Sequence, residues 1–377
     1  MMKAKRIILS IISAVLIALM MASFIPISYM VRPEEYNRDN IAGFYAEESN
    51  SLDMVYIGGS ACFVYWEVLR AWNQYGFTSY NFAHDTITPE AVKYYIKEAR
   101  KTQNPKLWLI DLRPFQYGEE SYSSEIDTPN MYYEVPIRNG TDHMLYSKNR
   151  NELIDTSVKN KSEIIPYYVD FIKYHSNWRN ICLNAFRCLQ TKSVDPIINN
   201  NIKSNPLKGF YFIEKTLPVD FTDYSSVTEE TTIPDEVNDL FLDLVDYCKQ
   251  EKLTVLFIVH SYCQTEDHKK EYNYMRRIIE ENGFDFLNTN DYYKDIGLDY
   301  SMDLYNENHV NVFGAEKYTD FVAKYIDMHY DLPDKRDQAE YADWNRLYDE
   351  FELKTDEVKK VILDLRNKQS ENESNTK

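Results

Sequence analysis

The sequence predicts an α/β fold in which helices flank a parallel sheet. Three stretches, 51–58, 107–112 and 253–260, are predicted to be short buried strands, and 107–112 is apolar almost throughout, as a parallel strand covered on both faces is. Helical patterns separate them, and strands that alternate with helices are typical of a layered α/β domain. At 377 residues with 44% hydrophobic content, the chain is long enough to bury such a core.

The remaining elements follow in chain order. After the first strand comes a helical pattern around Trp66 and Trp72, and then a second strand at 78–82. Thr88-Pro89-Glu90 has the cap, the proline and the acid that begin a helix, which is expected to run to about residue 101. Beyond residue 233 we expect helices at 234–252, 267–282 and 314–327 and a short strand at 284–287.

Regular alternation is lost over residues 115–233, a segment rich in Tyr, Asn and Ser with helical character around 167–189. We interpret it as a large helical insertion into the α/β domain. The expected position is a cap over the carboxyl edge of the sheet, where ligands bind in such folds. Its aromatic side chains would then either stack on sugar rings or pack within the cap.

The N-terminus predicts a membrane anchor. Residues 7–31 carry no charge, and about 25 residues of helix at 1.5 Å each would cross a bilayer. Lys3, Lys5 and Arg6 precede this run, which places residues 1–6 in the cytoplasm and the rest outside. The alternatives are a cleaved signal peptide, although no clear small-residue cleavage site follows the run, and a buried helix of a soluble protein. The expected localisation is the cell membrane, single-pass, with residues 32–330 as an extracytoplasmic domain.

The C-terminal segment, 331–377, is expected to be a helical tail. Trp344, Leu347 and Phe351 stand at helical spacing, and a second helical stretch covers about 355–365. The tail is either a packing or charged surface helix, or one that docks on a partner.

Composition excludes several classes of function. With 42 Lys and Arg against 60 Asp and Glu, the net charge is −18, so no nucleic-acid partner is expected. Five cysteines without a CxxC pair disfavour a disulfide framework and a cysteine zinc site. No cofactor is expected.

The first candidate for chemistry is Ser60. Glycine is scarce, at 10 residues, yet Gly58 and Gly59 stand together at the end of the first strand. A strand that ends in Gly-Gly-Ser and opens into a helix presents the serine hydroxyl at the edge of the sheet, with backbone N–H groups beside it, as a nucleophile and its oxyanion hole require. The alternative is an ordinary strand-to-helix turn.

The second candidate is His309. It lies in a loop rich in Asn and Asp, five residues before Gly314, which suits a general base. We expect no metal there, because no second histidine stands at ligand spacing. The other histidines are interpreted as structural: His84, His143, His175, His260, His268 and His329.

These two segments resemble the first and last blocks of the SGNH (GDSL-like) hydrolases. The matching stretches are 53–60, Asp-Met-Val-Tyr-Ile-Gly-Gly-Ser, and 306–317, Asn-Glu-Asn-His-Val-Asn-Val-Phe-Gly-Ala-Glu-Lys. Tyr-Asn-Phe-Ala at 80–83 is similar to the second block, and Leu-Ile-Asp-Leu-Arg-Pro-Phe at 109–115 to the end of the third strand. The resemblance covers about 45–330 without most of the insertion, and is greatest to the membrane-anchored branch near the D protein of teichoic-acid D-alanylation. It implies a flavodoxin-like three-layer sandwich.

The resemblance also implies roles for individual residues. Ser60 would be the nucleophile and His309 its base, while Gly59, Asn81 and Ala83 would form or support the oxyanion hole. Ala83 stands where the family commonly has glycine, which is harmless if the donor is its backbone N–H.

Asn306 stands where the family has aspartate, three residues before the histidine. An amide can orient an imidazole but cannot stabilise an imidazolium as a carboxylate does, and it can favour the wrong tautomer. We therefore expect Asp303, rather than Glu307, to supply the missing charge. Asp111 and Arg113 are expected to form an ion pair, either as a brace for the site or as a purely structural pair.

The expected function is that of an extracytoplasmic serine esterase or O-acyltransferase acting on a cell-envelope polysaccharide through an acyl-enzyme at Ser60. The expected partners are an envelope glycan or acyl donor and, as the resemblance implies, a membrane-bound O-acyltransferase. The alternative is a catalytically degenerate member that binds envelope glycan or scaffolds its assembly, and Asn306 favours it.

Overall fold

A five-stranded parallel sheet forms the centre of the protein in the computed structural model, which describes residues 2–32, 36–116, 131–177, 179, 182 and 204–375. The strand order is β2-β1-β3-β4-β5, that of the flavodoxin-like doubly wound folds. The predicted α/β class with a parallel sheet is confirmed. The strands are β1 (Met54–Gly58), β2 (Ser79–Ala83), β3 (Leu107–Asp111), β4 (Val255–Val259) and β5 (Asp285–Asn288).

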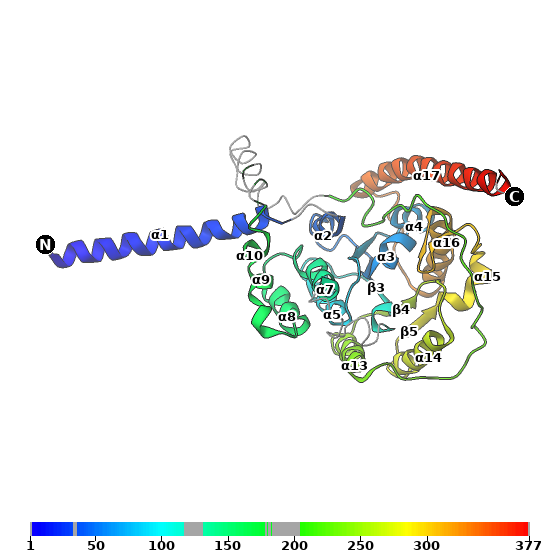
Figure 1. The fold of residues 1–377 in the computed structure, drawn as a ribbon, viewed down its shortest axis with the longest axis horizontal. Coiled ribbons are helices and arrows are strands. Elements are labelled where there is room, and N and C mark those ends of the chain that lie inside the picture. Colours follow the sequence, from blue (N-terminus) through cyan, green and yellow to red (C-terminus); the bar gives the residue numbers. More distant parts are fainter. Residues whose placement is uncertain are drawn as a thin grey trace.

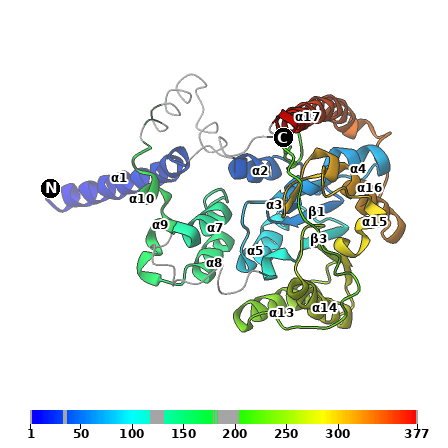
Figure 2. The ribbon, with the colours of Figure 1, turned by 45° about the vertical axis from the view of Figure 1, so that its right-hand side comes forward.

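Helices cover both faces of this sheet (Figures 1 and 2). One face carries α5 (Pro89–Ala99), α13 (Asp235–Gln250) and α14 (Glu266–Glu281). The other carries α3 (Ser60–Tyr65), α4 (Val68–Tyr75) and α16 (Val312–His329). Every residue of β1 to β4 is buried, which explains why β1, β3 and β4 are apolar almost throughout. Strand β2, Ser-Tyr-Asn-Phe-Ala, is buried although it carries two polar side chains.

The order of the strands determines where a ligand can approach. From β1 the chain passes to β2 on one side and later returns to β3 on the other side of β1. The crevice at this reversal, beyond the carboxyl ends of the strands, is the usual ligand site of such sheets. Ser60 follows β1 directly and Arg113 follows β3, so both lie at that edge.

The described part of the 115–233 insertion differs from the expected cap. It forms α7 (Met131–Thr141), α8 (Lys148–Ser157), α9 (Ile165–Tyr168) and α10 (Asp170–Tyr174), with 183–190 outside the described residues. Of these helices, α8 packs against α5, and α10 packs against the N-terminal helix. Helices α8 and α10 therefore lie beside the sheet (Figure 1), whereas α7 contacts the residues that follow β2. Two described parts of the insertion reach residues that line the site. Asn139 Nδ2 in α7 donates to Asp85 O at 3.3 Å, and the Tyr211 N–H donates to Phe63 O at 2.7 Å.

Two helices precede the sheet, α1 (Met2–Met30) and α2 (Tyr36–Tyr45). Helix α1 projects from the rest of the molecule (Figure 1), and its apolar side chains between Ile7 and Met20 are exposed. Among the described residues, no helix combines the length and the apolar character needed to span a membrane.

The C-terminal tail is one continuous helix, α17 (Ala342–Asn375), rather than the two stretches expected. Trp344, Leu347 and Phe351 are buried, and the Trp344 ring lies 5.2 Å from that of Trp72 in α4. Between β5 and α16 lie a short helix, α15 (Tyr293–Ile296), and a two-stranded antiparallel sheet of β6 (Leu304–Asn306) and β7 (His309–Val310).

Candidate active site

Ser60 is the first residue of α3, and Gly59 is its N-cap. The tight turn depends on Gly58, because a Cβ there would lie 2.8 Å from Cβ of Asp111 and 3.0 Å from Cβ of Cys62. The N–H groups of a first helical turn have no acceptor within their own helix. Ser60 therefore presents a hydroxyl and a backbone donor at the same point.

The small β6–β7 sheet brings His309 to this serine. Nε2 of His309 lies 2.7 Å from Oγ of Ser60, across 249 residues of sequence. In the antiparallel register His309 pairs with Asn306. The expected partnership of Ser60 and His309 is thus present in the geometry.

Asn306 orients the imidazole in the productive tautomer. Its Oδ1 atom lies 3.0 Å from Nδ1 of His309 and accepts the backbone N–H of Asn308 at 2.9 Å. A backbone N–H can only donate, so it fixes Oδ1, the acceptor, on the side that faces both groups. His309 then carries its proton on Nδ1 and offers the Nε2 lone pair to the Ser60 hydroxyl. The wrong tautomer considered in the sequence analysis is not the one that this geometry favours.

The electrostatic surroundings keep His309 neutral. Burial lowers the pKa of its imidazole to about 3, and the positive charge of Arg113 and the neighbouring His260 act in the same direction. The amide of Asn306 supplies no opposing negative charge. His309 can therefore accept a proton at neutral pH, but the imidazolium that results is poorly stabilised.

Asp303 does not take the role expected of it. Its buried carboxylate pairs with Nζ of Lys317 at 2.6 Å and accepts the backbone N–H of Asp299 at 2.7 Å. These contacts hold the start of the His309 loop to α16, so Asp303 is a structural residue. Glu307 is exposed.

The Asp111–Arg113 pair is also rearranged, because His260 stands between the two side chains. Nδ1 of His260 lies 3.5 Å from Oδ1 of Asp111, and its Nε2 lies 3.1 Å from Nη1 of Arg113. Arg113 Nη1 also donates to the backbone oxygen of Asn308 at 3.2 Å. Arg113 thus holds the loop that carries His309, as a brace would. His260, which was expected to be a structural residue, therefore belongs to the polar contacts that support the site. In the sequence, only its position just after β4 could have indicated this role.

The residues of the second block, 80–83, make contacts other than those that the resemblance implied for an oxyanion hole. The Asn81 side chain donates to Trp66 O at 2.9 Å and to Gly209 O at 3.4 Å, so it ties α3 and the insertion to β2. Ala83 pairs with Gly58 across the two strands, and its carbonyl accepts from Asn40 Nδ2 at 2.8 Å. The residues after β2 reach the site instead. Thr86 has a φ of +53°, a conformation that is strained for a β-branched residue and that is frequent at functional sites.

A cavity of about 410 Å³ opens over these groups. Its wall combines the serine, the histidine and the asparagine with apolar and aromatic side chains from α3 and the insertion. The lining residues are Ser60, Phe63, Val64, Asp85, Thr86, Tyr211, Ile213, Tyr305, Asn306 and His309. Within the part of the chain that the structure describes, no cluster of three or more His, Cys, Asp or Glu is placed to hold a metal.

Comparison of the chain with protein-family models, with curated proteins and with solved structures finds no match. The function is therefore inferred from the geometry of the site.

Proposed function

We propose that the protein is a serine esterase or O-acyltransferase that acts through an acyl-enzyme at Ser60. One observation carries the proposal: Ser60 Oγ, His309 Nε2, His309 Nδ1 and Asn306 Oδ1 form a continuous chain with spacings of 2.7 and 3.0 Å. A nucleophile within hydrogen-bond reach of a base, itself oriented by a third group, is the arrangement of nucleophilic acyl transfer. An amide fills the third position in the Cys-His-Asn papain-like proteases as well.

The reaction would begin with attack of Ser60 Oγ on the ester carbonyl carbon, while the hydroxyl proton passes to His309 Nε2. The Ser60 N–H would donate to the developing oxyanion. The bond between carbon and the leaving oxygen then breaks, and that oxygen takes the proton from Nε2, which leaves the acyl group on Oγ. Water or a sugar hydroxyl repeats these steps in reverse and yields a free acid or a new ester.

The proposed substrate is an acylated cell-envelope polysaccharide. Tyr211 and Tyr305 give the cavity aromatic surface of the kind on which sugar rings pack, and Tyr211 is 44% exposed. The SGNH-like order of the sequence blocks supports the same class. The resemblance also supports a role beside a membrane-bound O-acyltransferase that delivers the acyl group.

We also propose that α1 anchors the protein in the cell membrane with the α/β domain outside. Although no described helix meets the usual length and hydropathy criterion for a membrane span, three observations support the anchor. They are the uncharged run at 7–31, the preceding Lys3, Lys5 and Arg6, and the exposure of the apolar side chains from Ile7 to Met20. Buried packing does not explain such exposure, whereas lipid does.

A second candidate function is binding without catalysis. It is favoured by the contact of His309 with an amide rather than a carboxylate, together with the low pKa of the imidazole. In this case the cavity would hold an envelope glycan, and Ser60 would be unreactive.

Labelling with a fluorophosphonate, measured by intact mass, distinguishes catalysis at Ser60 from binding without catalysis. The full-length protein in detergent would be compared with Ser60→Ala and His309→Ala, and with Ser225→Ala as a matched serine outside the site. We expect one adduct on the wild type and on Ser225→Ala, and none on the other two. A folded wild type that acquires no adduct would favour the binding function.

A further inference from the structure

Helix α10 is attached to the last turns of α1. The rings of Phe24 and Phe171 meet edge to face with centroids 5.9 Å apart. Just beyond α10, Asn177 Nδ2 donates to the carbonyl of Val31 at 3.0 Å. The anchor and the insertion therefore share an interface, although more than 130 residues separate them in sequence.

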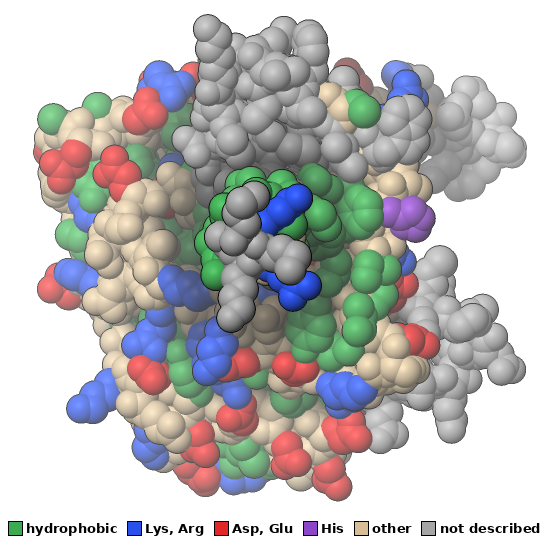
Figure 3. Space-filling view, turned by 90° about the vertical axis from the view of Figure 1, so that its left-hand side faces the viewer, with side chains coloured by type: hydrophobic (Ala, Val, Ile, Leu, Met, Phe, Trp, Pro, Cys, Tyr) green, Lys and Arg blue, Asp and Glu red, His purple; other side chains and the backbone are tan. Residues whose placement is uncertain are grey.

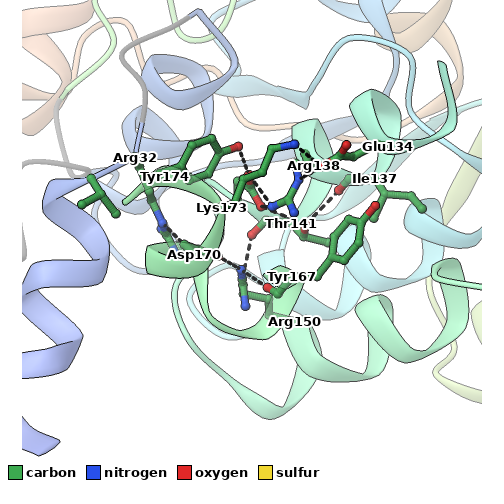
Figure 4. Close-up of polar contacts among 12 residues, drawn as sticks. Arg32, Glu134, Ile137, Arg138, Thr141, Arg150, Tyr167, Asp170, Lys173 and Tyr174 are labelled. Carbon is green, nitrogen blue, oxygen red and sulfur yellow. Dashed lines mark hydrogen bonds and ion pairs between the residues drawn. The ribbon is translucent and has the colours of Figure 1, made fainter. Parts of the chain in front are cut away.

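A buried ion cluster makes this attachment rigid (Figure 4). Asp170 at the start of α10 receives Arg32 Nε at 2.6 Å and Arg150 Nη2 at 2.8 Å, and all three side chains are fully buried. Arg32 also donates to the carbonyl of Met144, and Arg150 to that of Thr141. Because removal of one member would leave an uncompensated buried charge, the cluster strongly disfavours separation of α10 from α1.

This attachment determines the height of α10 relative to a bilayer. Phe24 belongs to the uncharged run that begins at Ile7, and 17 residues of helix at 1.5 Å each place it about 25 Å further along. The hydrocarbon core of a bilayer is about 30 Å thick. If α1 spans it from Ile7, Phe24 lies just inside the outer boundary, and Phe171 lies beside it.

The surface at that height is suited to lipid. Ile165 and Ile172, in the adjoining helices α9 and α10, are 57% and 46% exposed, and Phe24 is 40% exposed. Seen along α1 from its N-terminal side, hydrophobic side chains form one patch around the helix axis, to which α1 itself contributes, with Lys and Arg among the side chains at the margin (Figure 3). Residues 131–177 carry six acidic and six basic side chains, so this segment adds nothing to the net charge of −18.

We propose that the surface formed by Phe24, Ile165 and Ile172, the membrane-proximal surface, lies in the outer interface of the bilayer that α1 spans. The inference rests on the anchor proposed above. Contact at a second point would hold the insertion against the membrane and fix the orientation of the α/β domain. An uncharged contact area would also avoid the repulsion that the acidic domain experiences from anionic lipid.

Photolabelling from lipid tests this surface. The full-length protein would be reconstituted in phosphatidylcholine vesicles containing a lipid with a diazirine near the top of one acyl chain. After illumination, the labelled peptides would be mapped by mass spectrometry. We expect label on α1 and on the peptide that contains Ile165 and Ile172. The peptide around Met328 in α16, which is 62% exposed, should carry none.

Matched substitutions sharpen the result. Ile172→Lys should reduce label on the 165–172 peptide about tenfold, since burial of one isoleucine is worth roughly that factor, whereas Met328→Lys should change nothing. Unchanged α1 label shows that the variant is still inserted.

Label on α1 without label on 165–172 would overturn the membrane-proximal surface alone, and would direct attention to a protein partner for this face. Absence of label from α1 as well would overturn the anchor and the surface together. Fluorophosphonate labelling of Ser60 reports separately on the proposed chemistry.

Discussion

The side-chain oxygen of Asn306 lies 3.0 Å from Nδ1 of His309, so an amide occupies the place that a carboxylate takes in Ser-His-Asp triads. Orientation and charge are thereby separated in this site. The Asn306 amide and the Asn308 N–H set the tautomer of His309. Position 306 carries no negative charge that would stabilise the protonated imidazole.

Asn306→Asp should raise the rate of Ser60 acylation. A carboxylate would keep the contact with Nδ1 and stabilise the imidazolium. Because the tautomer is already correct, the gain should fall well short of the roughly 10⁴-fold loss known for the reverse change in a protease triad. The rate of fluorophosphonate labelling measures it, with Glu307→Gln in the same loop as a control that should have no effect. A slower Asn306→Asp protein would contradict the proposed role of the amide.

The rate of Ser60 acylation should fall only at a lower pH than is usual for a histidine base. A base is active when deprotonated, and the pKa of His309 is lowered to about 3. The labelling rate should therefore stay level from pH 8 to pH 5, instead of halving near the ordinary histidine pKa of about 6.5. In Asn306→Asp the acid limb should move to higher pH, because the new charge raises the His309 pKa. A midpoint near pH 6.5 in the wild type would show that the ring is not desolvated as described.

Gly58→Ala should destabilise the protein and abolish labelling of Ser60. The new Cβ would meet Asp111 at 2.8 Å and Cys62 at 3.0 Å, both in the core, and overpacking of this kind costs about 1–3 kcal/mol. Gly59→Ala is the matched control. Its Cβ would lie 3.3 Å from the Ile87 methyl group, which is closer than usual, but a side-chain methyl group can shift to relieve the contact. Urea unfolding of both variants would measure the difference. Equal stabilities would contradict the close approach of β1 to Asp111.

Asp170→Asn should loosen the insertion from α1. It leaves two buried guanidinium groups without their shared charge, and a broken buried ion pair costs roughly 3–5 kcal/mol. Protease cleavage within residues 131–177 should accelerate accordingly. Glu152→Gln removes a surface carboxylate that pairs with Lys148 and Lys97, and its effect should not exceed about 1 kcal/mol. Equal cleavage rates would show that the cluster does not fasten the insertion.

Much of the fold could be predicted because buried parallel strands have a local signature. The apolar runs that end at Gly58 and around Asp111 and Val259 each became a strand, with boundaries shifted by a few residues at most. Ser60 and His309 could also be selected locally, one from a glycine turn and the other from an Asn-rich loop. The contact between Ser60 and His309 depends on the order of the strands in the sheet, and the alternation of strands and helices predicts that order only in outline.

The partners of the polar side chains could not be predicted in the same way. Asp303 and Asn306 are three residues apart, yet a lysine of α16 pairs with the first, and the β6–β7 pairing places the second beside His309. Asn81 is in a strand buried on both faces, so its polarity does not mark a solvent face, and the backbone carbonyls of Trp66 and Gly209 that it contacts could not be predicted. The position of the insertion depends on a buried ion cluster between distant segments, and charge spacing along the sequence does not reveal such a cluster.

The separation of Ser60 and His309 by 249 positions has a consequence for the time at which the proposed chemistry could begin. The serine belongs to the first strand–helix junction, whereas its base arrives with the last hairpin before α16. A chain interrupted between residues 60 and 309 has the candidate nucleophile but not its base. Reactivity at Ser60 would thus report that the whole α/β domain has assembled. If the domain is exported as proposed, Ser60 would stay unreactive during export until nearly all of the domain has crossed the membrane.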